Sequence, residues 1–391
     1  MKDELKLSPH KIDRNPEPTF GADPEFFIVT KKGTVLNSDR FFPSVKKKMK
    51  VRSGFDHAIS GLFFDGIQAE FNMPYHTCRE WLLDDIWYIF KKVHDVIGDD
   101  YNVSLSPCVK VRKDILAKAD PRARIFGCEP DFDAYSGKTN KIIVDPEEHP
   151  LRYAGGHMHF GRVSLSHYFT SENVEVRKFV KLLDILVSIP LVLLERDPLA
   201  AERRYLYGRA GCYRHTRYGV EYRTPSSFWL AAPELTSFVF GQGRLAYRIM
   251  LCNAEDYFLK LVESNLVRYA IDYNDYDAAK QVYSTVKYNM AMASTEDTDP
   301  MCIEGTDDYY TMGILNGMAM FEWLVLNGIN EVFGDPDLRI RWQLDIEEDE
   351  FEDHGDTAKG WFWGMYQKAY DEKDYRSFLK KKFKMEHANY L

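Results

Sequence analysis

The feature that most constrains the fold of this chain is a recurring alternation of polar and apolar residues in short segments. In a β-strand, residues two positions apart project from the same face of the sheet. Four segments follow this spacing and carry charged or metal-binding side chains at alternate positions: GADPEFF, DGIQAEF, GGHMHFG and GVEYRT. If the four strands belong to one sheet, their polar side chains meet on one concave face. The sequence therefore predicts a sheet with a chemically active polar face.

The alternate positions supply four pairs of side chains suited to binding a cation or a phosphate. The pairs are Asp23 with Glu25, Gln68 with Glu70, His157 with His159, and Glu221 with Arg223. Several carboxylates on one face repel one another unless a cation neutralises them. Magnesium suits carboxylate oxygens and commonly bridges substrate phosphates. We therefore expect a divalent metal on this face, with imidazole as an additional ligand or phosphate contact.

A cluster of arginines precedes and enters the last of these strands, in a chain whose net charge is −9. The cluster comprises Arg203, Arg204, Arg209, Arg214, Arg217 and Arg223. Arginine presents a planar fork of donors to phosphate and stays protonated, so these side chains would balance the charge of a transferred phosphate. The sequence contains no Walker A motif and no GxGxxG. Phosphate binding must therefore rely on metal and arginine rather than on a glycine-rich loop.

The remaining patterns predict how the chain is organised. The expected parts are a loose polar arm at residues 1–19, a sheet domain at 20–232 and a mostly helical region at 233–391 packed on it. The expected strands lie at residues 21–29, 62–72, 153–163 and 218–224, and the expected long helices at 77–97 and 172–196. The second helix should be kinked or broken near Pro190, which cannot donate a main-chain hydrogen bond. An acidic loop is expected at residues 345–356.

Composition argues against several classes of function. The acidic net charge disfavours a dedicated nucleic-acid binder. The most apolar stretch, residues 182–194, is shorter than a membrane span, and the first twenty residues lack the apolar core of a signal peptide. Six cysteines occur without the short spacings of zinc or redox motifs. We expect a cytoplasmic protein with reduced thiols and no membrane partner, while monomer and homo-oligomer both stay open.

The order of these motifs resembles that of the phage-type carboxylate–amine ligases (COOH–NH2 ligase type 2), in the glutamine synthetase and glutamate–cysteine ligase superfamily. The segments that carry the resemblance are GADPEF, DGIQAEFN, FGCEPD, GGHMHFG and RYLYGRAGCYR followed by GVEYRTPSSFW. The resemblance covers roughly residues 20–232. It implies an α+β fold, in which a glutamine synthetase-like curved antiparallel sheet carries helices on its convex side and metal ions on its concave face.

The resemblance also implies roles for individual residues. The metal ligands would be Asp23, Glu25, Glu70, His159 and Glu221, with Asp23 standing where relatives have glutamate. The nucleotide contacts would be Arg203, Arg209, Arg214 and His157. The residues acting in catalysis would be Arg209, Arg214, Arg223 and Glu70. The implied cofactors are ATP and two or more Mg²⁺ ions, with Mn²⁺ as an alternative metal.

A ligase of this family would be an ATP-dependent carbon–nitrogen ligase, or amidoligase, acting on a carboxylate and an amine. The carboxylate attacks the γ-phosphate of ATP to give an acyl phosphate, and the amine then displaces phosphate to form a peptide-like amide. An amino acid, a peptide and a modified macromolecule all stay open as substrates. A phage gene would place the protein in the cytoplasm of its host.

Other functions fit parts of the pattern. A phosphotransferase on the same fold would use ATP and metal but stop at a phosphorylated acceptor. A zinc-dependent hydrolase would use His157 and His159 with a distant carboxylate and keep one coordination position open. A non-catalytic protein that has kept the fold would not need the full metal and arginine set. Each polar pair, taken alone, also fits an ordinary exposed strand, and only the ordered set of motifs favours the ligase.

Overall fold

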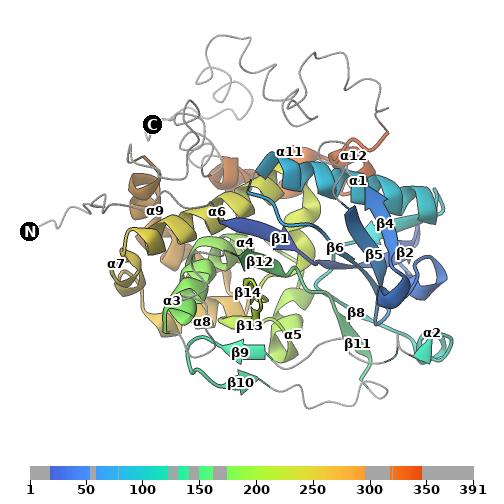
Figure 1. Ribbon diagram of the computed structural model, residues 1–391, viewed down its shortest axis with the longest axis horizontal. Coiled ribbons are helices and arrows are strands. Elements are labelled where there is room, and N and C mark those ends of the chain that lie inside the picture. Colours follow the sequence, from blue (N-terminus) through green and yellow to red (C-terminus); the bar gives the residue numbers. More distant parts are fainter. Residues whose placement is uncertain are drawn as a thin grey trace, which may run out of the picture.

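The computed structural model describes residues 18–52, 59–77, 79–121, 124, 131–140, 149–161, 174–295, 318 and 320–345. Figure 1 shows this part of the chain as coloured ribbons. Almost all of the expected arm, the acidic loop beyond Asp345 and most of the FGCEPD motif lie outside the described residues.

The described strands form two large antiparallel sheets and one small one. The first sheet consists, in spatial order, of β1 (Thr19–Ala22), β12 (Met158–Gly161), β14 (Gly219–Tyr222), β13 (Cys212–Thr216), β9 (Asp131–Asp133) and β10 (Thr139–Asn140). The second consists of β3 (Val35–Leu36), β2 (Glu25–Thr30), β6 (Gln68–Asn72), β5 (Ile59–Asp65) and β4 (Met49–Arg52), with β7 (Tyr101–Ser104) also paired to β2. The small sheet pairs β8 (Cys108–Lys110) with β11 (Leu151–Tyr153).

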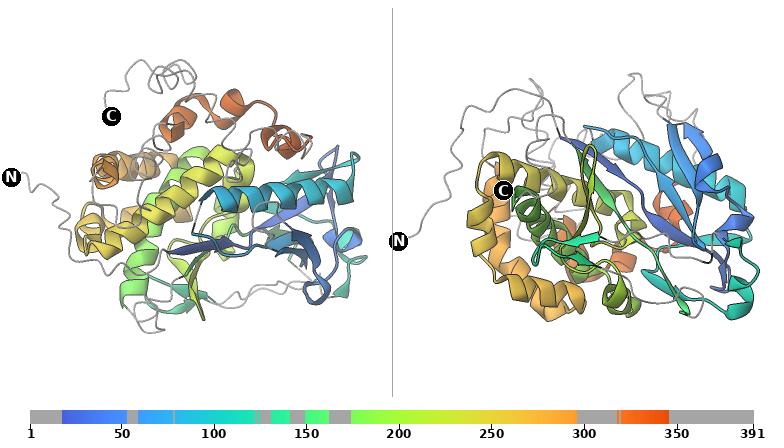
Figure 2. Two further views of the ribbon diagram at one scale, coloured as in Figure 1. Left: turned by 45° about the horizontal axis from the view of Figure 1, so that its top comes forward. Right: turned by 60° about the horizontal axis from the view of Figure 1, so that its bottom comes forward.

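One stretch of chain, residues 19–30, runs through both large sheets. Its first half is β1 and its second half is β2, with Asp23 and Pro24 between them. On one side of this joint, Asp23 N–H donates to the carbonyl of His157 at 3.3 Å and Glu25 N–H donates to that of Gly155 at 2.8 Å. The main chain of residues 71–73 bonds to the other side. The two sheets therefore form one curled antiparallel surface shaped like a half-barrel (Figure 2).

Helices cover the apolar face of this surface. The longer ones are α1 (Arg79–Ile97), α3 (Val174–Leu183), α5 (Leu199–Leu206), α6 (Pro233–Leu251), α8 (Ser264–Asp272) and α9 (Tyr276–Thr295). The shorter ones are α2 (Lys113–Leu116), α4 (Ile189–Leu194), α7 (Glu255–Lys260), α11 (Ile329–Phe333) and α12 (Leu338–Arg341), with 3₁₀ turns η1 (Ser38–Arg40), η2 (Val45–Lys47) and η6 (Ser227–Ala231). One continuous core contains residues from Phe20 to Leu344, so the helices after residue 232 share the core of the strands.

Helix α6 packs closely on the first sheet because it carries a glycine at the contact. The ring of Phe160 on β12 makes edge-to-face contacts with Phe20 and Phe179, with centroids 5.6 and 5.3 Å away. A Cβ atom at Gly243 of α6 would lie 2.7 Å from Cε1 of Phe160. The absence of a side chain at Gly243 therefore sets how near the helix approaches the sheet.

The expected strand at residues 62–72 is wrong, because this segment is a hairpin. Strand β5 ends at Asp65 and β6 begins at Gln68, and these two residues face each other across the pair. Gly66 occupies the turn with a φ of 60°, a conformation that glycine adopts without steric cost. The turn reverses the chain, so Asp65 lies on the same face as Gln68 and Glu70. A single strand would have placed Asp65 on the opposite face.

The helix expected at residues 172–196 is interrupted near Pro190, as predicted, and the interruption is a π-helical turn. Helix α3 ends at Leu183, residues Asp184–Ser188 form the π-helix η5, and α4 begins at Ile189. Pro190 follows within the first turn of α4, where its missing N–H costs little. The wider π-turn also leaves Asp184 fully buried, where its carboxylate accepts a hydrogen bond from Tyr222 on β14 at 2.7 Å.

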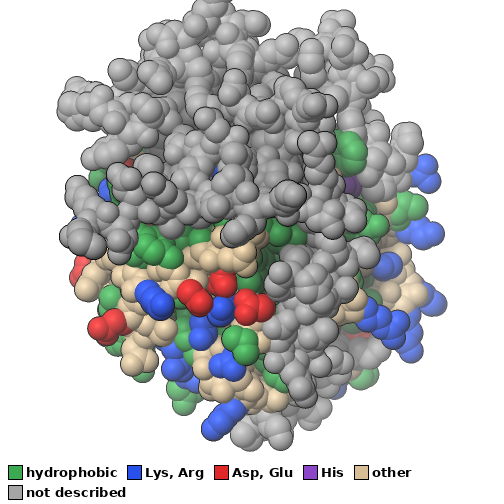
Figure 3. Space-filling model, turned by 60° about the vertical axis from the view of Figure 1, so that its left-hand side comes forward, with side chains coloured by type: hydrophobic (Ala, Val, Ile, Leu, Met, Phe, Trp, Pro, Cys, Tyr) green, Lys and Arg blue, Asp and Glu red, His purple; other side chains and the backbone are tan. Residues whose placement is uncertain are grey.

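The surface is mixed in charge on the face that Figure 3 shows. Acidic and basic side chains lie beside one another near its centre, and basic side chains continue toward its lower margin. Within the described part of the chain, no helix combines the length and the apolar composition needed to cross a membrane.

Replacing Gly243 with alanine is expected to lower the free energy of unfolding. Overpacking of this kind costs about 1–3 kcal/mol, which outweighs the roughly 1 kcal/mol that alanine gains over glycine in a helix. Ser284→Ala, at an exposed position of α9, is the control in which only helix propensity changes. Urea unfolding of both variants tests the contact, and a Gly243→Ala variant as stable as Ser284→Ala would contradict it.

Candidate functional site

The four polar pairs predicted from the sequence lie on one face of the curled sheet, opposite the helices. Within the first sheet, His159 faces Glu221 directly, and Arg214 faces Glu221 from the other side. Across the joint, Glu25 on β2 faces Glu70 on β6. Their neighbours of opposite parity, such as Phe160 and Tyr222, are buried in the core. The polar and apolar residues that alternate in the sequence therefore lie on opposite faces of the sheet.

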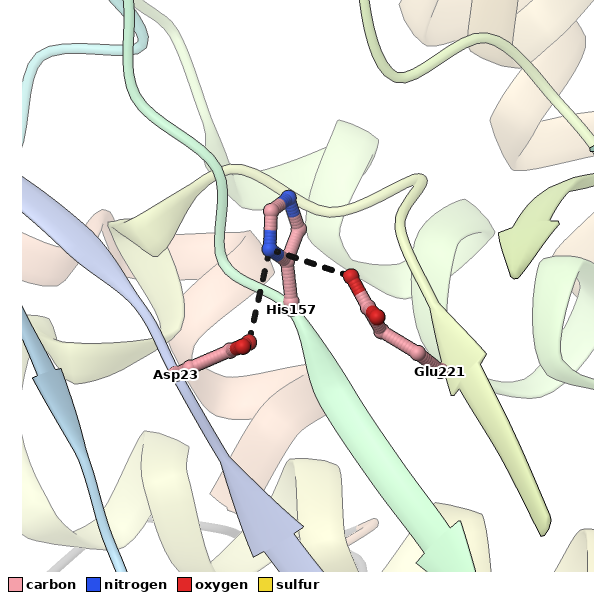
Figure 4. Close-up of side chains that lie close together, drawn as sticks. All are labelled: Asp23, His157 and Glu221. Carbon is pink, nitrogen blue, oxygen red and sulfur yellow. Dashed lines mark ion pairs between the residues drawn. The ribbon is translucent and has the colours of Figure 1, made fainter. Parts of the chain in front are cut away.

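One group of possible cation ligands combines two carboxylates and an imidazole. Asp23 follows β1, His157 precedes β12 and Glu221 lies on β14 (Figure 4). His157 Nδ1 lies 3.4 Å from Asp23 Oδ1 and 3.5 Å from Glu221 Oε1. One ligand atom from each residue lies within 4.8 Å of the others. We refer to these three residues as the histidine cluster.

A second group consists of carboxylates alone. Glu25, Asp65 and Glu70 also each place one oxygen within 4.8 Å of the others, and we refer to them as the carboxylate cluster. Glu25 is buried, and its Oε2 accepts a hydrogen bond from Gly155 N–H at 2.6 Å. Hard divalent cations prefer such all-oxygen sites. The donor chemistry of the carboxylate cluster therefore fits Mg²⁺ or Mn²⁺.

Burial and repulsion between its negative charges destabilise the ionised form of the carboxylate cluster. Burial, together with the nearby Asp65 carboxylate, raises the pKa of Glu25 to about 8. Burial and the charges of Asp23 and Glu25 raise the pKa of Glu70 well above its usual range, and burial raises the pKa of Asp65. The cluster therefore retains protons near neutral pH, unless a cation takes their place.

His159 makes a different set of contacts from His157. Its Nε2 lies 2.8 Å from Asp23 Oδ1, and its Nδ1 contacts the hydroxyl of Tyr218. Burial alone would raise the pKa of Asp23, but the charges of the two histidines lower it far below its usual range. Both nitrogens of His159 are thus engaged, and it is His157 that lies in the histidine cluster.

Two of the predicted arginines hold Glu221 between them. Arg223 Nη1 donates to Glu221 Oε1 at 2.6 Å, and Arg214 donates to Glu221 Oε2 through Nε at 2.7 Å and Nη2 at 2.6 Å. Arg223 is buried, whereas the Arg214 side chain is 30% exposed. Charge-assisted pairs of this kind fix the orientation of a carboxylate. Both arginines therefore hold the Glu221 carboxylate in its position beside His157.

Arg203 and Arg209, the other two arginines to which the resemblance gives roles, lie elsewhere. Arg203 is buried and donates to the carbonyls of Ala154, Thr224 and Pro225 at 2.8–2.9 Å. These contacts tie the start of β12 to the end of β14. Arg209 is exposed, and its Nε donates to the carbonyl of Arg204 at 3.3 Å. Among the described residues, the Arg209 guanidinium forms no hydrogen bond or ion pair with either cluster.

Tyr207 is a site residue that the sequence analysis missed. It follows α5 and is buried, and its hydroxyl accepts a hydrogen bond from Arg223 Nη2 at 2.9 Å and contacts His157 Nε2. Its ring also lies between two guanidinium groups, 5.0 Å from that of Arg203 and 5.5 Å from that of Arg223. By engaging Nε2, Tyr207 leaves His157 Nδ1 directed at the carboxylates. Its position inside the arginine-rich segment was the available signal.

Two glycines allow the main chain at the start of β12 to approach the end of β14. Gly156 N–H donates to the carbonyl of Pro225 at 2.9 Å, and the Gly156 carbonyl accepts from Trp229 Nε1 at 3.1 Å. A Cβ atom at Gly156 would lie 2.0 Å from the carbonyl oxygen of Ser226. The double glycine therefore fixes where His157 enters the polar face.

Comparison with known proteins bears directly on this region. Residues 148–295 match the family described as phage phiEco32-like COOH.NH2 ligase-type 2. The match confirms the resemblance to this ligase family over the matched residues. The matched ligase-type 2 region contains the two histidines and the arginine-rich segment, whereas Asp23, Glu25 and Glu70 come from the part of the chain before it.

Other comparisons add little. No curated protein matches this chain. Among solved structures, a bifunctional glutathione synthetase from Pasteurella multocida is 12% identical, with a TM-score of 0.31. The alignment covers 78% of this chain and 52% of that one, so this chain spans about half the length of that protein. A likeness at this level carries no argument about fold or activity.

Tyr207→Phe is expected to weaken binding of Mn²⁺ about tenfold or more, because groups that orient a metal-binding imidazole typically affect affinity by 10–100-fold. The variant keeps the ring between the guanidinium groups and removes only the hydroxyl at His157. Calorimetric titration of the purified protein with Mn²⁺ measures the change. Tyr205→Phe, whose ring is 71% exposed, is the control. Equal affinities for the two variants would show that the hydroxyl does not orient the site.

The metal-free protein is expected to lose stability as the pH rises. Because the pKa of Glu25 is raised from 4.5 to about 8, its contribution to stability is complete below about pH 4.5 and is lost as the pH rises through 8. The melting temperature in EDTA should therefore fall by about 5 °C or more between pH 6 and pH 9.

Two controls define the origin of that change. Excess Mg²⁺ should oppose the loss by neutralising the cluster, and Glu25→Gln should flatten the pH dependence. A melting temperature in EDTA that is constant over this range, or a Glu25→Gln variant with the full dependence, would show that Glu25 is not the group responsible.

Proposed function

We propose that this protein is an ATP- and Mg²⁺-dependent carboxylate–amine ligase that forms an amide through an acyl phosphate. The observation that carries the proposal is the pair of clusters on one polar face. Asp23 of one cluster and Glu25 of the other are separated only by Pro24. The match of residues 148–295 to a COOH.NH2 ligase family supports the reaction class.

In this proposal each cluster holds one cation. Asp23, His157 and Glu221 are the ligands of the first, and Glu25, Asp65 and Glu70 are the ligands of the second. Bound divalent cations would neutralise these carboxylates and offset the negative charge of the nucleotide's phosphates. His159, predicted as a ligand, is assigned instead to holding Asp23 through its Nε2.

The proposed reaction has two steps. An oxygen of the substrate carboxylate attacks the γ-phosphorus of ATP, the bond to the bridging oxygen breaks, and ADP leaves. The amine nitrogen then attacks the acyl carbon, inorganic phosphate leaves and the nitrogen loses a proton. The protein's own contribution is positioning and charge stabilisation, as is typical of phosphoryl transfer. No enzyme nucleophile is required.

The arginines have separate roles in this proposal. Arg214 reaches the polar face from β13 and its side chain is 30% exposed, so we assign it the contact with the transferred phosphoryl group. Arg223 holds Glu221 and Tyr207 in place. Arg203 acts through the main chain that it ties together. Arg209 stays a predicted nucleotide contact.

We also propose the wider setting predicted from the sequence. A glutamine synthetase-like catalytic domain would comprise residues 20–232, with the helical region 233–391 packed on it, and the protein would act in the cytoplasm.

The zinc hydrolase is less well supported, because only His157 of the two histidines lies in a cluster and the second cluster is all oxygen. The phosphotransferase is separated from the ligase by its product.

The decisive experiment measures phosphate release from ATP with and without Mg²⁺, against a pool of acids and amines, and follows the masses of the products. A ligase gives phosphate release that requires both substrates, with a product one water lighter than their sum. A stable phosphorylated acceptor would indicate the phosphotransferase, and metal-dependent hydrolysis without ATP would indicate the hydrolase.

Glu25→Gln, Glu70→Gln and Glu221→Gln are each expected to reduce this turnover at least about a hundredfold while folding normally, because each removes one charged ligand. Glu322→Gln, on the far side of the core beside Lys287, is the control and should retain turnover. Retained turnover in all three site variants would remove the proposed site.

A further inference from the structure

To bind an anionic substrate, the polar face needs positive charge on the side of the second sheet. In the first sheet, Arg214 and Arg223 both pair with Glu221. The second sheet brings three carboxylates to the face, so an anionic substrate lying across the joint would meet mostly negative charge there. The sequence KKKMKVR runs from residue 46 to residue 52, through the end of η2 and into β4 at the edge of this sheet.

The register of β4 decides which of its residues reach the polar face. Lys50 lies opposite Gly61 on β5, and Gly61 lies opposite Asn72 on β6. Met49 and Val51 pack on the core beneath the sheet. By alternation, Lys50 projects on the same face as Asn72. Lys48 comes just before β4, between it and η2, and its side chain reaches Asn72 on that face.

Lys48 extends inward across the sheet. Its Nζ donates to Asn72 Oδ1 on β6 at 3.3 Å, on the other side of β5 from β4. The path is open because Gly61 has no side chain: a Cβ there would lie 2.4 Å from Lys48 Cδ and 2.5 Å from Asn72 Oδ1. The methylene stem of Lys48 therefore occupies the space that a side chain at position 61 would fill.

This path ends beside both clusters. Asn72 lies two residues after Glu70 on the same face of β6. The N–H groups on either side of Asn72, those of Phe71 and Met73, donate to the carbonyls on either side of Asp23, those of Pro24 and Ala22. The ammonium of Lys48 therefore reaches the strip between Asp23 and Glu70.

We propose that Lys48 binds the polyphosphate of the nucleotide, as the phosphate-binding cation of the second sheet. This inference rests on the proposed ligase function. Its recorded hydrogen bond goes to a neutral amide oxygen, and no carboxylate among the described residues forms an ion pair with it. The side chain is exposed, so the ammonium can exchange Asn72 for a phosphate oxygen. Lysine binds phosphate as a compact point charge on a flexible stem.

Edge protection explains this lysine less well. Lysines on edge strands commonly prevent pairing with other chains, and the exposed Lys50 on β4 suits that purpose. Lys46 and Lys47 are also exposed, but they lie in η2 before the strand. A protective lysine points to solvent and does not require a glycine on the neighbouring strand. Glycine within a strand weakens it and often marks a close approach of another group. Gly61 therefore indicates a lysine positioned toward the interior of the face.

Calorimetric titration of the full chain with MgATP tests this inference. Lys48→Met keeps the apolar stem over Gly61 and removes only the charge. It is expected to bind MgATP about ten- to hundredfold more weakly, as loss of one charge-assisted hydrogen bond predicts. Lys47→Met removes the same charge from an exposed neighbour and should bind as the unchanged protein does. Lys48→Arg should recover most of the affinity.

The outcomes separate this inference from the proposed function. If the unchanged protein binds MgATP and Lys48→Met binds it equally well, Lys48 is not the phosphate contact and the ligase proposal stands. If Lys47→Met and Lys48→Met lose affinity equally, the effect is one of general charge and the inference is overturned. If the unchanged protein does not bind MgATP at all, the proposed function falls and this inference falls with it.

Discussion

The architecture of the polar face depends on one stretch of main chain shared by two sheets. Glu25 N–H donates to the Gly155 carbonyl in the segment that leads into β12 of the first sheet, while the Pro24 carbonyl accepts from Phe71 N–H of the second at 3.4 Å. Without this joint, the histidine and the carboxylate clusters would belong to separate surfaces. With it, residues from six strands and their ends converge, and the buried like charges become a consequence of topology. The raised pKa values of the carboxylate cluster are the electrostatic result of that convergence.

The sequence predicted much of this arrangement because strand periodicity is local. Alternation correctly assigned Glu25, Glu70, His157 and Glu221 to one face, and their apolar neighbours to the core. Helical spacing likewise predicted a helix at residues 77–97, close to the observed α1. Such patterns need no knowledge of distant partners. The curled antiparallel sheet itself was implied by the family resemblance.

The sequence could not supply the contacts that depend on tertiary structure. Asp65 was not among the predicted ligands because its place on the polar face depends on a turn at Gly66. Arg203 carries the charge and the position of a phosphate ligand, yet it binds three carbonyls from segments distant in sequence. Tyr207 and Lys48 show no periodic pattern that distinguishes them. Their roles emerge only from what lies opposite them in space.

Pro24 gives the joint a further property. Its ring holds φ near one value, and it lies between the two residues that lead into the two clusters. The spacing between the clusters is therefore set by three consecutive residues rather than by how the two sheets pack against each other. If each cluster holds a cation, the distance between the two cations is set largely by residues 23–25. A substrate would then be selected by whether the spacing of its anionic groups matches that distance.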